Sequence, residues 1–120
     1  MKTPPIFFVL IVFILSSCTH TSEQDLIDTT PITEIVTYRD NVKNIIDTNC
    51  ISCHTNPPVN GAPMSLLTYE NVKDAIENRG LIARISSDDL GFVMPFGGPK
   101  LPQNLIDIII QWQEDGLLEE

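Results

Sequence analysis

The segment Cys50-Ile51-Ser52-Cys53-His54 constrains this chain more than any other part of its sequence. Four kinds of site use a Cys-x-x-Cys pair: a disulfide, a thiol redox motif, a zinc site and a covalently attached haem. Each of them places a different demand on the remaining residues. The surroundings of the motif therefore decide between them.

The net charge of the chain limits the kinds of partner that it can bind. Its 120 residues carry 16 Asp and Glu against 7 Lys and Arg, a formal net charge of −9. Phosphate backbones and anionic membrane surfaces repel so acidic a chain, so we expect no nucleic-acid partner. A solvated acidic surface and steering toward a basic partner both explain the charge. A hydrophobic content of 42% is enough for one small packed domain.

The N-terminus has the pattern of an export signal. An unbroken apolar run, IFFVLIVFIL, follows Lys2 and is shorter than the ~20 residues of a membrane-spanning helix. The next residues, Leu15-Ser16-Ser17-Cys18, resemble the lipobox of bacterial lipoproteins. That resemblance implies that residues 1–17 are removed, that Cys18 is lipidated and that the protein lies on the periplasmic side of a membrane. Thr19, rather than Asp, slightly favours the outer membrane. An ordinary secretory signal and an uncleaved anchor are the alternatives.

Lipidation of Cys18 also resolves the cysteine count. The chain has three cysteines, and an exported protein with an odd number needs an explanation for the extra one. With Cys18 acylated, Cys50 and Cys53 remain as a pair. Residues 18–36 are rich in Thr, Asp and Glu and have no sustained apolar period, so we interpret them as a flexible tether.

The segment 37–120 has the pattern of a small all-α domain. Apolar residues recur at helical spacing from about residue 37 to Cys50, between Thr68 and Gly80, and after Pro102 as far as Gly116. A short turn of helix is expected at LIARIS. The residues expected to face the core are Tyr38, Val42, Ile45, Ile46, Tyr69, Val72, Ala75, Ile76, Leu105, Ile108, Ile109 and Trp112. Two loops rich in Gly and Pro separate the helices. Such a domain has a weak core, so a staple or a large apolar filler is expected.

The four chemistries differ in the residues that they require. Zinc needs four ligands, and Cys50, Cys53 and His54 supply at most three. A thiol redox motif is expected after a strand in a βαβ unit, but a helix precedes this one. A plain disulfide leaves His54 without a role. Haem attachment uses all three residues, since the thiols form thioethers and the histidine coordinates iron.

From residue 38 to 116 the order of features resembles a small monohaem bacterial cytochrome c, class I-like. The shared features are a helix, CISCH, a loop, further helices, a Met-Pro loop and a final helix with Trp. The resemblance implies three to four short helices and long loops wrapped around one covalent haem c. It implies electron transfer between a redox protein donor and an acceptor, without catalysis. The alternative is a haem enzyme or sensor subunit, peroxidase-like or gas-binding, with an open distal site.

The resemblance also implies the iron ligands. His54 is expected on one side of the iron and Met94, in the segment VMPFGGP, on the other. Met64 is expected to have a packing role. The carbonyl of Pro63 is a candidate to orient His54, and an ordinary turn proline is the equal alternative. Propionate partners stay open among Arg79, Arg84, Lys100 and Trp112, each of which has an equally good structural role.

Overall fold

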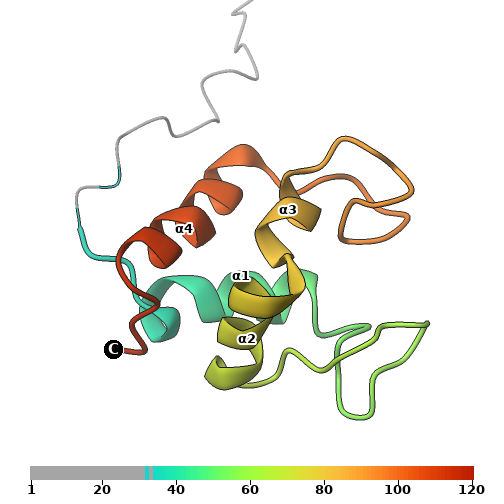
Figure 1. Cartoon of the computed structure of the whole chain (residues 1–120), viewed down its shortest axis with the longest axis horizontal. Helices are drawn as coiled ribbons and strands as arrows, with labels where there is room; N and C mark the ends of the chain where they lie inside the picture. Colours follow the sequence, from blue (N-terminus) through green and yellow to red (C-terminus); the bar gives the residue numbers. More distant parts are fainter. Residues whose placement is uncertain (1–31, 33) are drawn as a thin grey trace, which may run out of the picture.

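The computed structural model describes Ile32 and residues 34–120. In this part the chain forms one π-helical turn and four α-helices, with no strand among the described residues (Figure 1). The elements are η4 (Tyr38–Val42), α1 (Lys43–Asn49), α2 (Tyr69–Arg79), α3 (Leu81–Ser86) and α4 (Gln103–Glu114). This confirms the prediction of a small all-α domain. Cys18, the predicted signal segment and most of the predicted tether lie outside the described residues.

The first helical segment begins where the sequence predicted. The hydroxyl of Thr37 accepts a hydrogen bond from the amide of Asp40 and caps η4. The four residues expected to face the core, Tyr38, Val42, Ile45 and Ile46, are all buried. The packed body starts one residue before the predicted boundary, since Val36 is only 2% exposed and its amide donates to Asp115.

The next two helices are separated by one glycine. The Thr68 side chain accepts from the amide of Asn71 and caps α2, as predicted. Gly80 has φ +68° and ψ +35°, a left-handed conformation that an L side chain rarely adopts. It ends α2 and directly precedes α3, so the chain changes direction with no intervening loop.

The last helix packs the predicted stripe against the core and also buries Ile106, which was not predicted. The fully buried residues of α4 are Ile106, Ile109 and Trp112, while Leu105 and Ile108 are half-buried at its edge. The spacing of 3 between the buried residues is also helical, so the sequence contained two overlapping apolar faces. The neighbouring helices determine which face is covered.

The two ends of the packed body meet beside an aromatic cluster of Tyr38, Tyr69 and Trp112. Their ring centroids are 5.6–6.2 Å apart. After α4 the chain turns back, and the amides of Tyr38 and Arg39 donate to the carbonyls of Leu118 and Glu119. The C-terminal residues are therefore hydrogen-bonded to the first helical turn, η4.

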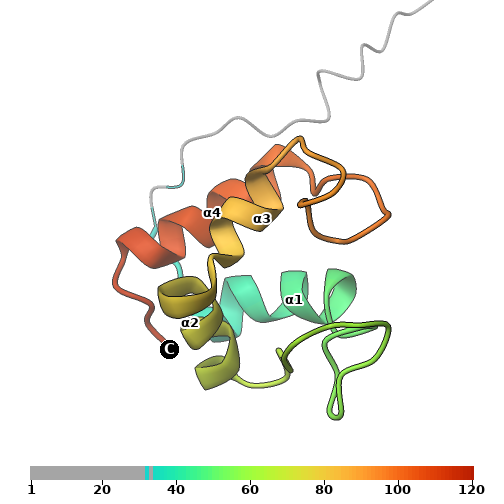
Figure 2. The same cartoon turned by 45° about the vertical axis from the view of Figure 1, so that its right-hand side comes forward.

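Two long loops extend from the opposite end of the helical body. The first loop, residues 50–68, joins α1 to α2, and the second loop, residues 87–102, joins α3 to α4. Figures 1 and 2 show both loops on the same side of the molecule, away from the C-terminus. None of the helices among residues 34–120 is long and apolar enough to cross a membrane.

Candidate haem-attachment site

The Cys-x-x-Cys-His motif begins at the end of α1. Cys50 is the C-cap of that helix, and its carbonyl accepts from the amides of Cys53 and His54 at 3.2 and 3.0 Å. The motif thus forms a tight turn that continues from the helix. Cys50 and Cys53 are thus separated by one turn of chain. Both thiols are free and half-buried.

His54 is held by a main-chain carbonyl. Its Nδ1 lies 2.8 Å from the carbonyl oxygen of Met64, across the first loop. The loop is closed further by the amide of Leu66, which donates to the carbonyl of His54 at 2.8 Å. When Nδ1 carries the proton and donates to a carbonyl, Nε2 keeps its lone pair for a metal. This is the arrangement that a metal-binding histidine needs.

The sequence placed this carbonyl one residue too early. Pro63 was the candidate, and the structure instead gives the hydrogen bond to Met64. Both residues lie in the same loop, and carbonyls leave no signature in a sequence, so only the path of the chain decides between them. Met64 was expected to pack, and its half-buried side chain does contact the core. Its second role, through the main chain, was missed.

The Cys50 thiol has the wrong acidity for a redox motif. Burial raises the pKa of this thiol to about 11, because desolvation disfavours the thiolate. Cysteines that exchange disulfides have a lowered pKa, which supplies the thiolate nucleophile. The environment of Cys50 thus opposes the thiol redox interpretation, in agreement with the helical setting.

The arrangement of the side chains does not support a zinc site. No group of three or more His, Cys, Asp or Glu side chains comes together as a metal site anywhere in residues 34–120. Cys50, Cys53 and His54 are adjacent in the chain, yet they do not converge on one point.

Met94 lies in the second loop. Its amide donates to the carbonyl of Arg84 at 3.1 Å, which ties it to the last turn of α3. Val93, just before it, is 2% exposed, whereas Met94 itself is half-buried against the edge of the core. The loop therefore anchors one side chain in the core and leaves the next one partly uncovered. The predicted ligands His54 and Met94 stand on separate loops that leave the body on the same side (Figures 1 and 2).

The residues present fit a haem. The donor set combines an imidazole whose Nδ1 is already bonded, a half-buried thioether and two free thiols. Several apolar side chains that pack against the core are only partly buried: Cys50, Ile51, Met64, Tyr69, Ile82, Met94, Leu105, Ile108 and Ile110. A bound apolar macrocycle would gain free energy by covering side chains of this kind.

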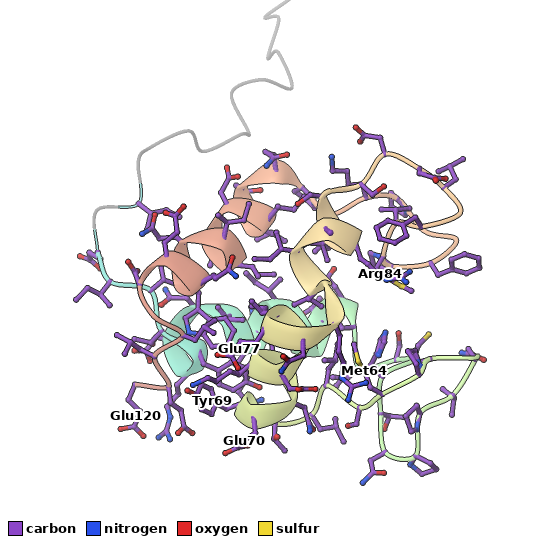
Figure 3. All side chains as sticks on the ribbon, viewed as in Figure 1. Met64, Tyr69, Glu70, Glu77, Arg84 and Glu120 are labelled. Atoms are coloured by element: carbon purple, nitrogen blue, oxygen red, sulfur yellow. The ribbon has the colours of Figure 1, made fainter. Side chains whose placement is uncertain are left out.

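The four candidate propionate partners differ in whether their polar groups are already paired. Arg79 pairs with Asp74, and Lys100 with Asp88. Trp112 is fully buried in the aromatic cluster, and its indole N–H donates to the carbonyl of Leu118 at 2.7 Å. That donor is already used at the end of the molecule away from the loops. Arg84 has no carboxylate partner among residues 34–120, and Figure 3 shows it beside the second loop.

The first loop and the middle of the second loop contain no charged residue. No Asp, Glu, Lys or Arg occurs from residue 48 to 69 or from residue 90 to 99, although such residues make up 19% of the chain. Several large apolar side chains of these loops are exposed: Val59, Leu67, Leu90, Phe92 and Phe96. The acidic side chains labelled in Figure 3, Glu70, Glu77 and Glu120, belong to α2 and the C-terminus. Within residues 50–68 and 90–99, these exposed apolar side chains therefore have no charged residue in the same segment.

Comparison with protein-family models, with curated proteins and with solved structures gives no match.

Proposed function

We propose that this protein is an electron carrier with one covalently attached haem c and a cytochrome c-like fold. In this proposal Cys50 and Cys53 would hold the haem through thioethers, and His54 and Met94 would be the ligands of its iron. The observation that carries it is the hydrogen bond from His54 Nδ1 to the Met64 carbonyl, next to two free thiols. No disulfide or thiol redox motif needs a histidine oriented in this way.

Bound haem would supply an iron that changes oxidation state by one electron. The protein would hold the group through two covalent bonds, orient the imidazole through Met64 and offer a thioether from the second loop. A histidine and methionine pair raises the reduction potential and leaves no open position for small ligands. Both effects favour electron transfer over catalysis.

The N-terminal pattern supports a location. A lipid on Cys18 would tether the domain to the periplasmic side of a membrane, with the outer membrane slightly favoured by Thr19. Redox proteins would serve as donor and acceptor, and the net charge of −9 argues against nucleic acid as a partner.

The test uses the full chain exported from a bacterial host and purified in mild detergent. Its absorption spectrum should change between oxidised and reduced forms and should not respond to carbon monoxide. Met94→Ala should lower the reduction potential and admit carbon monoxide. Met64→Leu is the matched control, because it removes the other thioether near the site but keeps the main-chain carbonyl that orients His54.

Three results would count against the proposal or a part of it. Preparation of the exported protein without covalent haem would refute it outright. Carbon monoxide binding by the wild-type protein would instead support the open distal site of a haem enzyme or sensor. Equal potentials in the wild type and Met94→Ala would reject Met94 as the ligand.

A further inference from the structure

Arg84 contacts the second loop on both sides of Val93. Its guanidinium carbon lies 4.3 Å from the ring centroid of Phe92, and its Nη1 donates to the Phe92 carbonyl at 3.4 Å. Its own carbonyl accepts the amide hydrogen of Met94 at 3.1 Å. One residue at the end of α3 thus holds the chain immediately before and at the predicted iron ligand.

The charge of Arg84 is used differently from that of the other arginines. Arg39 pairs with Glu120 and Arg79 with Asp74, both on the helical body and its terminus. Arg84, a half-buried residue, forms no ion pair within the described part of the chain, and its guanidinium lies over an aromatic face instead. Such a contact is favourable when the cation is partly shielded from water. Arginine is suited to it, because its planar group can stack and donate at once.

Few other main-chain hydrogen bonds hold the loop near Met94. The carbonyl of Asp89 accepts the amides of Phe92 and Val93, so the first half of the loop is closed on itself. After Met94, the only main-chain hydrogen bond before residue 102 in the described structure is local, from Gly98 to Pro95. The Met94 amide bond to Arg84 is therefore the last main-chain link between this loop and the helices.

We propose that Arg84 is a positioning residue for Met94. By stacking on Phe92 and bonding its carbonyl, the guanidinium keeps the segment from Phe92 to Met94 against α3, so that the Met94 amide stays bonded to Arg84. The Met94 thioether is then presented from a fixed main chain. Without the guanidinium, the loop would move away from α3 more often, and Met94 would be displaced more easily. This inference depends on the proposed function, since it concerns Met94 as an iron ligand.

The test measures displacement of the Met94 ligand in the purified haem-bound protein. Imidazole is titrated into the oxidised protein, and loss of the methionine–iron charge-transfer absorption is followed. Arg84→Ala should lower the half-displacing imidazole concentration roughly tenfold, because it removes a stacking contact and a charged hydrogen bond. Arg84→Lys, which keeps the charge but not the planar fork, should fall between wild type and Arg84→Ala. Arg79→Ala is the matched control and should behave as wild type.

Phe92→Leu provides a second route if Arg84→Ala cannot be purified with haem. It removes the aromatic face and keeps the Phe92 carbonyl, so the half-displacing concentration should fall by a smaller factor, about threefold. If Arg84→Ala has the same half-displacing imidazole concentration as the wild type, the positioning role is overturned, but Met94 ligation is not. Where Arg84→Ala cannot be purified with haem, the same result in Phe92→Leu has the same meaning. A wild-type protein with haem but no methionine–iron absorption would refute Met94 ligation, and the positioning role with it.

Discussion

Two tyrosines in the aromatic cluster should respond in opposite directions to loss of the same atom. The Tyr69 hydroxyl donates to the carbonyl of Leu117 at 2.8 Å. The Tyr38 hydroxyl is buried, and no hydrogen-bond partner for it exists among the described residues. Tyr69→Phe and Tyr38→Phe both delete one oxygen and keep the ring, so the comparison isolates the hydrogen bond.

The magnitudes follow from these environments. Tyr69→Phe removes a hydrogen bond and leaves the carbonyl of Leu117, a residue 7% exposed, without this partner, which should cost about 1–2 kcal/mol in the free energy of unfolding. Leu117 also has a positive φ of 59°, and a strained residue depends on such surrounding contacts. Tyr38→Phe removes a buried hydroxyl that gains nothing in return, so it should be neutral or stabilise the fold by about 1 kcal/mol.

Thermal unfolding of the haem-bound proteins, followed by far-ultraviolet circular dichroism, measures the difference. For a domain of this size about 1 kcal/mol corresponds to roughly 4–8 °C, so the two variants should differ in Tm by about 10 °C. Trp112 contacts both rings, and near-ultraviolet dichroism would show that the cluster is otherwise intact. Equal destabilisation of the two variants would refute the reasoning, because it would mean that the Tyr38 hydroxyl has a partner of its own.

Three further predictions address the helices and the motif. Thr68→Ala removes the cap of α2 and should lower the free energy of unfolding by about 1 kcal/mol in urea titration, with Thr68→Ser near wild type as the control. Hydrogen bonds from Arg79, then Asn78, lower the pKa of Asp74 below its ordinary value of 3.8. The stability that the ionised Asp74 adds should therefore be fully present above pH 3.8 and should be lost as the pH falls through the lowered pKa. Wild type and Asp74→Asn should therefore converge in Tm at acid pH; a gap that is constant with pH would contradict this. Cys50 and Cys53 of the exported protein should not react with thiol reagents before or after reduction, and recovery of free thiols by mass spectrometry would overturn the haem proposal.

The sequence predicted the helices well because their signals are local. Thr68 and Gly80 mark the two ends of α2 through a side-chain cap and a left-handed residue, and both can be recognised from residue type. On α4 the burial of Ile106 was missed, and Leu105 packs only at the edge of the core, because both lie on apolar faces and contact with other helices decides which is fully covered. Local rules contain no information about that contact.

The candidate site also combines residues that the sequence identifies with contacts that it does not. Cys50, Cys53 and His54 are recognised by their spacing, and the structure adds the environment that opposes a redox role for Cys50. The Met64 carbonyl could not be distinguished from that of Pro63, because every residue has a carbonyl and only the path of the loop selects one. The contacts of Arg84 with Phe92 and Met94 were also beyond the sequence, since they join α3 to a loop of irregular geometry.

The absence of charge from residues 48–69 and 90–99 has a consequence for the rate at which partners associate. In a protein of net charge −9, long-range attraction by a basic surface acts on the charged residues outside these two segments. A redox partner that contacts only these segments would gain little from this attraction, so its association rate should lie near the unsteered ~10⁵–10⁶ M⁻¹s⁻¹ and change little with ionic strength. A partner that meets the helices should bind faster at low salt. The salt dependence of the association rate therefore reports which end of the molecule a partner approaches.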